Sequence, residues 1–277
     1  MTNDKNDPFY FFLHTPKAAG TTLRSIVDLQ LGRKCVLTYY NQPNRHLLDN
    51  LDAHLKMNEG RYKALIGHFE FGPHDGISQS SKYVTFFRDP VRRTISSYFE
   101  NLKTRPDLFE DKDGSIMSLE KSFQSMPGFF ANQQTKMICG NVKDDTATQD
   151  DLDSAKANLE KYFLLAGITE LFNESILILS KELGWRPCLY RRLNKGANRP
   201  EISVTVKELA TNLNQLDQQL YEYALSQLRN RIEEYGTNFA KALLEVESTL
   251  SIYDSEGTAD AEFTNVDIPA VMRFLSK

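Results

Sequence analysis

Four short apolar runs along the chain predict buried β-strands. They read FYFFL at 9–13, ALI at 64–66, YVTFF at 83–87 and FLLAGI at 163–168. Each run is continuously apolar rather than alternating with polar residues, which is typical of parallel strands that helices cover on both faces. The pattern therefore predicts a central parallel sheet.

Longer segments with helical periodicity separate these runs and follow them. Helices are expected to begin near Thr21, near Glu170 and near Pro90, a residue that suits a first helical turn. Apolar positions at the same spacing predict further helices over 45–58, 127–139, 151–161 and about 213–250. Alternating strands and helices indicate an α/β fold with helical additions toward the C-terminus.

Two segments and the tail lack this periodicity. The segment 104–115 is charged and the segment 186–201 is basic, so both are predicted to be loops. The tail from about residue 255 is acidic, and it ends in IPAVMRFLSK, a candidate for a short docking helix. We therefore expect one domain over 1–254 and a separate tail over 255–277.

Composition narrows the class of protein. The 277 residues carry a net charge of −4 and are 40% hydrophobic, which excludes a disordered or fibrous chain. This acidic balance would not attract nucleic acid, so any anion site must come from a local cluster. Cys35, Cys139 and Cys188 form no CxxC pair and are expected to be free thiols. No apolar run approaches the roughly 18 residues of a membrane span, and we expect a cytoplasmic protein without a transmembrane segment.

The segment after the first apolar run has the pattern of a phosphate-binding turn. It reads HTPKAAGTT and passes from a strand into a helix, where backbone N–H groups and the helix N-terminus attract an anion. Small residues let the anion approach, hydroxyls add donors and a lysine adds full charge. The residues concerned are Lys17, Ala18, Ala19, Gly20, Thr21 and Thr22. Because Lys17 precedes Gly20, the order differs from the GxxxxGK[ST] loop of nucleoside triphosphatases.

A second strand-to-helix segment, YVTFFRDPVRRTISSYFE at 83–100, repeats this design. Arg88 ends the strand and Ser96 lies two turns along the helix, so a guanidinium and a hydroxyl could hold one phosphate together. Active sites of open α/β sheets lie at this edge.

Both segments also have a simpler interpretation. Lys17 could be a surface lysine at a helix start. In the second segment, Asp89 could cap the helix and pair with Arg92 or Arg93 on a solvated face, which is what we expect for these two arginines.

Together the two segments resemble the 5′-phosphosulfate and 3′-phosphate motifs of sulfotransferases that use 3′-phosphoadenosine 5′-phosphosulfate (PAPS). FLHTPKAAGTT and FFRDPVRRTISSYF are similar to the motifs of the carbohydrate group, typified by heparan sulfate 2-O-sulfotransferases and their bacterial relatives. Weaker similarities lie at 67–72, 132–140 and 166–185. The resemblance spans roughly 9–200 and implies a P-loop-like three-layer fold. Ala18 departs from it, since the family commonly has threonine there.

The resemblance implies a reaction and roles for the site residues. Sulfonate would pass from PAPS by in-line displacement to a hydroxyl of a glycan, lipid-linked sugar or small molecule, leaving 3′-phosphoadenosine 5′-phosphate (PAP). Lys17 would donate to the bridging oxygen, residues 18–22 would hold the 5′-phosphate, and Arg88 with Ser96 would hold the 3′-phosphate. No metal is required, and the five histidines show no metal-binding spacing.

His68 is the first candidate for the base that takes the acceptor proton. It follows the strand at 64–66 at the same sheet edge, and imidazole titrates near neutral pH. The family's G-H element agrees with this assignment. Glu70, His74 and His14 remain alternatives.

Two further segments are weaker candidates. The basic stretch 185–199 resembles a loop that closes over the nucleotide, with Arg191, Lys195 or Arg199 near the 3′-phosphate or an anionic acceptor. In the 132–140 segment, Asn132, Thr135 and Lys136 either line an acceptor cleft or face solvent.

Two other functions compete with the sulfotransferase interpretation. A nucleotide-dependent kinase would use similar anion sites with Mg²⁺, but the residue order disfavours it. A non-catalytic relative would bind PAP or a glycan without turnover.

Overall fold

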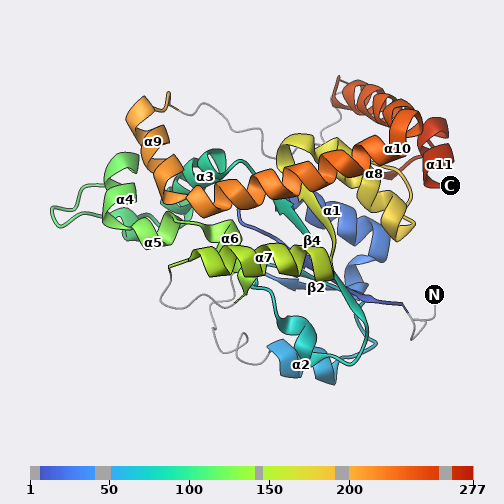
Figure 1. Cartoon of the computed structure of the whole chain (residues 1–277), viewed down its shortest axis with the longest axis horizontal. Coiled ribbons are helices and arrows are strands. Elements are labelled where there is room, and N and C mark those ends of the chain that lie inside the picture. The colour runs from blue at the N-terminus through green and yellow to red at the C-terminus, as the bar shows by residue number, and fades with distance from the viewer. Residues whose placement is uncertain (1–6, 41–50, 141–145, 191–199, 256–263, 277) are drawn as a thin grey trace.

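A five-stranded parallel sheet lies at the centre of the protein. The computed structural model describes residues 7–40, 51–140, 146–190, 200–255 and 264–276. Neighbouring strands are parallel throughout this sheet, so the predicted parallel α/β core is confirmed. In spatial order the strands are β2 (Val36–Tyr39), β3 (Ala64–Gly67), β1 (Phe9–Leu13), β4 (Ser81–Phe87) and β5 (Phe163–Ile168) (Figure 1).

The strands are apolar throughout because both faces of the sheet are covered. Consecutive side chains on a strand point to opposite faces. Phe11 stacks on Tyr83 with ring centroids 4.7 Å apart, whereas Phe12 stacks on Trp185 at 6.0 Å. Both phenylalanines are fully buried. This burial on two faces explains the continuous apolar runs.

Helices form the outer layers of the fold. In Figure 1, α7 lies in front of the strands and α1 lies behind them. The helices are α1 (Gly20–Leu31), α2 (Leu51–Met57), α3 (Pro90–Thr104), α4 (Leu119–Ser125), α5 (Pro127–Phe130), α6 (Gln133–Cys139), α7 (Gln149–Tyr162), α8 (Phe172–Leu183), α9 (Val204–Leu213), α10 (Gln215–Ser255) and α11 (Pro269–Leu275). Two short strands, β6 (Cys188–Leu189) and β7 (Thr264–Asn265), pair antiparallel.

Most predicted helices are present. One begins differently from the prediction, and another is interrupted. The starts near Thr21 and Pro90 are confirmed, whereas a single turn of 3-10 helix (Thr169–Leu171) precedes α8. The helix predicted over 127–139 is instead two helices. Asn132 adopts a φ of 48° between α5 and α6, and this left-handed conformation interrupts the helix.

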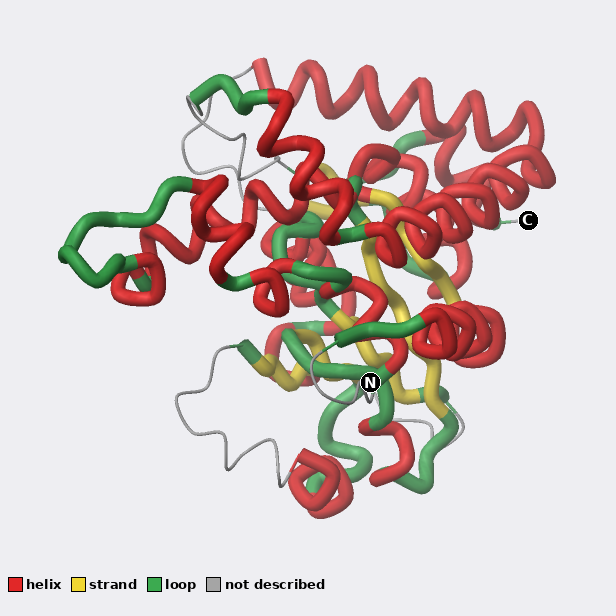
Figure 2. The backbone as a smooth tube through the Cα atoms, turned by 60° about the vertical axis from the view of Figure 1, so that its left-hand side comes forward, coloured by secondary structure: helices red, strands yellow, loops and turns green. Residues whose placement is uncertain are grey.

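The long C-terminal helix changes direction within its length. Gly236 has a φ of 59° inside α10, and Figure 2 shows the second half of the helix turning back. The helical spacing of apolar residues continues on both sides of Gly236, so the sequence pattern does not predict this change of direction. The sequence patterns also did not predict β2, α4 and α9, nor the two-residue strands β6 and β7, of which β6 lies in the segment 186–201 predicted to be a loop.

The short helix expected at the C-terminus is α11. Val271 and Phe274 are buried in the main core, and Lys181 Nζ donates to the Phe274 carbonyl at 2.9 Å. The helix therefore docks on α8 and α10. The domain boundary near residue 254 stays a prediction.

A buried polar network joins α3, α6 and α10. Asp217 is completely buried. Its carboxylate accepts hydrogen bonds from the Gln134 backbone N–H at 3.1 Å and from the Thr135 backbone N–H and hydroxyl at 2.7 and 2.8 Å. Arg93 is 1% exposed, and its Nε lies 4.0 Å from Asp217 Oδ2. The expectation of a solvated Arg93 is therefore wrong, because α3 presents this residue to α6 and α10. Arg92 is exposed as expected.

We predict that Asp217→Ala lowers the free energy of unfolding by about 3–5 kcal/mol, since it leaves the buried Arg93 guanidinium uncompensated. Urea denaturation followed by circular dichroism measures this change. Asp153→Ala, which removes an exposed aspartate from α7, should cost less than about 1 kcal/mol. Equal losses in the two variants would contradict the prediction.

Candidate functional site

The two predicted phosphate-binding segments meet at the carboxyl edge of the sheet. Strands β1 and β4 are neighbours, with Leu13 opposite Thr85, so the segments that follow them leave the sheet side by side. Arg88 Nη1 donates a hydrogen bond to the Lys17 carbonyl at 3.0 Å. This direct contact places both cationic residues in one site.

The segment after β1 forms a concave backbone turn. Lys17 and Ala19 both have left-handed backbone conformations, with φ of 70° and 59°, and the Ala18 amide donates to the Thr15 carbonyl at 3.2 Å. A turn with such residues directly before a helix is typical of the backbone concavities that bind anions.

The start of α1 adds further donors to this turn. The first amides of a helix have no acceptor within it. Among the described residues of α1, the first turn carries no acidic side chain, and Ala19 before it provides no side-chain cap. Thr21 is exposed beside these amides, whereas Thr22 and Ala18 are buried. The turn therefore offers mainly backbone donors, so the absence of a threonine at position 18 removes only one side-chain donor.

Gly20 has a packing role in addition to the predicted one. A Cβ at this position would overlap the imidazole of His14. The glycine thus lets the phosphate-binding turn close over the His14 ring.

Hydrogen bonds to its backbone hold Arg88 in position. The buried Gln134 side chain accepts from the Arg88 amide at 2.9 Å and donates to the Arg88 carbonyl at 3.1 Å. On the other side, Asp89 caps α3 by accepting from the Arg92 amide at 2.8 Å, as predicted. Because Gln134 also belongs to the Asp217 network, the position of Arg88 is tied to α6 and α10.

One face of helix α3 lies toward Lys17. Ser96 is 1% exposed on this helix. Glu100 lies one turn further along the same face, and its Oε2 accepts from Lys17 Nζ at 3.0 Å. Ser96 therefore lies on the side of α3 that faces the site. Glu100 was not among the predicted residues, because nothing in a local pattern links positions 83 residues apart.

A hydrogen bond fixes which ring nitrogen of His68 carries the proton. Its Nδ1 lies 2.8 Å from the His14 carbonyl. Since a carbonyl only accepts, Nδ1 carries the proton and the lone pair of the neutral ring is at Nε2. Burial lowers the pKa of His68 most strongly, the hydrogen bond to the His14 carbonyl raises it in part, and the nearby Lys17 charge lowers it. The side chain is thus neutral and able to accept a proton at neutral pH.

The other three candidates for the base have different surroundings from His68. The His14 ring lies 4.5 Å from that of His68, and its Nδ1 is buried without a hydrogen-bond partner among the described residues. Burial holds the pKa of His14 well below its usual value. His74 lies in an aromatic cluster, with Nδ1 2.9 Å from the Tyr83 hydroxyl. Glu70 is exposed.

The residues of the 132–140 segment form hydrogen bonds that brace α6. Asn132 accepts from the Asp217 backbone amide, Thr135 donates to the Asp217 carboxylate, and Lys136 Nζ donates to the Gly128 carbonyl. Thr135 and Lys136 are buried and Asn132 is half-buried, so the expectation that this helix exposes all three to solvent is wrong. Lys195 of the predicted basic loop lies outside the described residues, as do Arg191 and Arg199.

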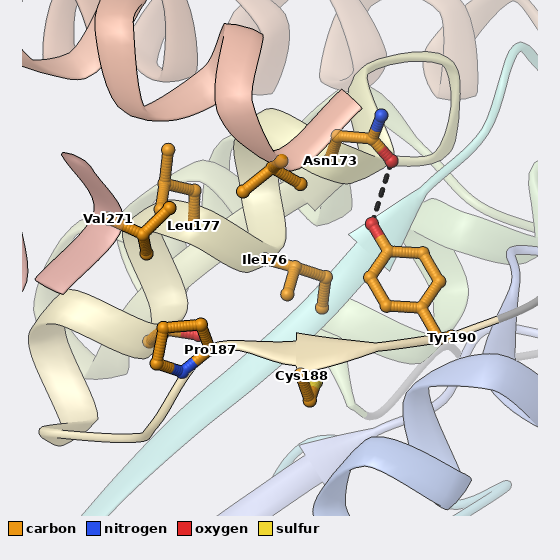
Figure 3. A pocket seen from close by; sticks show the side chains of 9 residues that line it. Asn173, Ile176, Leu177, Pro187, Cys188, Tyr190 and Val271 are labelled. Atoms are coloured by element: carbon orange, nitrogen blue, oxygen red, sulfur yellow. Dashed lines mark hydrogen bonds between the residues drawn. The ribbon is translucent and has the colours of Figure 1, made fainter. Parts of the chain in front are cut away.

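A small pocket lies apart from these residues. Apolar side chains of α8, β6 and α11 line it, and the Tyr190 hydroxyl donates to Asn173 Oδ1 at 2.7 Å at its edge (Figure 3). Over the part of the chain that the structure describes, no cluster of His, Cys, Asp or Glu has the composition of a metal site. The described helices also include none with the length and apolar character of a membrane span.

We predict that the free energy of unfolding falls as the pH drops from 7 to 5. The unfolded chain protonates His14 near pH 6.5, whereas burial keeps the folded side chain neutral. The unfolded state then binds more protons, and stability is lost at up to about 1.4 kcal/mol per pH unit for each such histidine. Urea denaturation at pH 7, 6 and 5 measures the slope. His14→Phe, which keeps an aromatic ring, should reduce the slope, and an unchanged slope would refute the assignment.

Known proteins with related sequences point to the same chemistry. A family model described as galactose-3-O-sulfotransferase matches residues 3–249. Heparan sulfate 2-O-sulfotransferase 1 of Xenopus laevis is 25% identical over 82% of this chain and 72% of its own, and that of Homo sapiens is 26% identical with the same coverage. Heparin sulfate O-sulfotransferase of Drosophila melanogaster is 25% identical over 76% of this chain and 69% of its own. Because the model match covers most of the sequence, this chain belongs to the galactose-3-O-sulfotransferase family and is a carbohydrate sulfotransferase.

Proposed function

We propose that the protein transfers sulfonate from PAPS to a hydroxyl group of a glycan. The observation that carries this proposal is the hydrogen bond from Arg88 to the Lys17 carbonyl, which unites the two anion-binding segments at one edge of the sheet. A donor with phosphate groups at both the 3′ and the 5′ positions of its ribose needs two such positive regions. The glycan acceptor is supported by the heparan sulfate named in the relatives.

The donor supplies an activated sulfonate, bonded to the 5′-phosphate through a bridging oxygen. Backbone amides at the start of α1 bind the 5′-phosphate, while Arg88 and Ser96 bind the 3′-phosphate. The Lys17 ammonium stabilises the negative charge that develops on the bridging oxygen as the S–O bond breaks.

His68 completes the reaction on the acceptor side. Its Nε2 takes the proton from the acceptor hydroxyl as the oxygen bonds to sulfur. The His14 carbonyl stabilises the resulting imidazolium by accepting from Nδ1. The reaction then releases PAP and the sulfated acceptor.

We expect His68→Ala to lose at least 100-fold in sulfonate transfer while still binding PAP, because general-base catalysis contributes about 10²–10⁴-fold. Transfer of radiolabelled sulfonate to a panel of glycans, with calorimetry for PAP, measures both properties. In the wild type, kcat/KM should fall on the acid side only below pH 6.5, since burial lowers the pKa of His68. Full activity in His68→Ala would remove this residue from the mechanism. Tight PAP binding without transfer to any acceptor would favour a non-catalytic protein.

We expect Arg88→Lys to weaken PAP binding by about 10- to 100-fold and to weaken binding of adenosine 5′-monophosphate clearly less, since Arg88 affects the 5′-phosphate turn only through the Lys17 carbonyl. A guanidinium forms paired, charge-assisted hydrogen bonds that a lysine ammonium does not reproduce. Calorimetric titration of both nucleotides into wild type and variant provides the comparison. An equal loss for the two nucleotides would show that Arg88 does not read the 3′-phosphate.

A further inference from the structure

The Glu100 carboxylate lies beside Lys17, in a site whose other charged groups would attract anions. Glu100 Oε2 lies 3.0 Å from Lys17 Nζ, and the side chains are 51% and 25% exposed. The two residues come from different elements, α3 and the turn after β1. The ammonium proposed to act on the donor is therefore already engaged by a negative side chain.

This carboxylate opposes the charge of the donor and of the product. The 5′-phosphate of PAP is a dianion near neutral pH, and it would approach the same ammonium. Like charges at such distances repel, and the repulsion is strongest where water is excluded. Glu100 and the 5′-phosphate thus compete for Lys17.

The exposure of the pair makes this competition reversible. Exposed ion pairs contribute little to stability, so an incoming phosphate can displace Glu100 without disturbing the fold. Glu100 lies in the fifteen-residue helix α3, whose first turn is fixed by the Asp89 cap. The Glu100 backbone therefore stays in place while its side chain changes rotamer and moves away from Lys17.

We propose, on the basis of the function proposed above, that Glu100 weakens binding at the 5′-phosphate end and promotes release of PAP. Glu100 pairs with Lys17. Ligand binding separates the pair, and its return to Lys17 favours departure of the product. Glu100 is thus a positioning residue that sets the affinity of Lys17 for anions, with no direct part in the bonds that form or break.

The test compares ligands that differ only in the 5′-phosphate. We expect Glu100→Gln to bind PAP about tenfold more tightly than wild type and to release it more slowly, by calorimetry and stopped-flow displacement. Binding of adenosine 3′-monophosphate, which lacks the 5′-phosphate, should not change. Glu233→Gln, which removes an equal charge from an exposed position on α10, should bind both ligands as wild type does.

The outcomes separate this inference from the proposed function. If wild type does not bind PAP, the proposed function fails. If wild type binds PAP but Glu100→Gln binds it no more tightly, the inference alone is overturned. It is also overturned if both ligands tighten equally, or if Glu233→Gln has the same effect, since either result would reflect net charge rather than the Lys17 pair.

Discussion

The hydrogen bond from the Arg88 guanidinium to the Lys17 carbonyl is the contact on which the site depends. It exists because β1 and β4 are adjacent parallel strands that end at the same edge. The bond helps hold Lys17 in its left-handed conformation, which costs free energy in any residue other than glycine. That conformation in turn directs the backbone amides before α1. A single side chain from one strand end thus shapes the anion-binding turn at the other.

The charges around this contact are arranged in three layers. Lys17 and Arg88 form the cationic layer, and Glu100 balances part of it from α3. The buried histidines behind the turn stay neutral, so they add hydrogen-bonding capacity without adding to the positive field. Deeper still, Arg93 and Asp217 balance one another in the network that supports Gln134. The buried Arg93–Asp217 pair is balanced in charge, which limits the cost of burying it.

Sequence patterns predicted the elements whose signal is local. The continuous apolar runs identified four of the five strands, since strands covered on both faces exclude polar residues. The two motifs located the cationic residues, because a strand end followed by a helix start fixes where their side chains can lie. His68 was placed at the correct edge for the same reason.

The remainder depended on contacts between distant segments. Arg92 and Arg93 are equivalent in a local pattern, and only packing against distant helices, which include α5 and α10, makes Arg93 buried. Gln134 and Glu100 acquire their roles through contacts across 46 and 83 residues. The interruption at Asn132 depends equally on its side chain, which accepts from the first amides of α10. No periodicity within a single helix carries such information.

The construction of the turn from main-chain amides has a consequence for how such a protein can diversify. Amide donors persist through any exchange of side chains that preserves the local path of the chain, so donor binding at this turn, as proposed, would tolerate substitution around it. Selection of the sugar acceptor, in contrast, must come from side chains. Under the proposed function, the two halves of the reaction can therefore change at different rates, and one donor site can serve many acceptors.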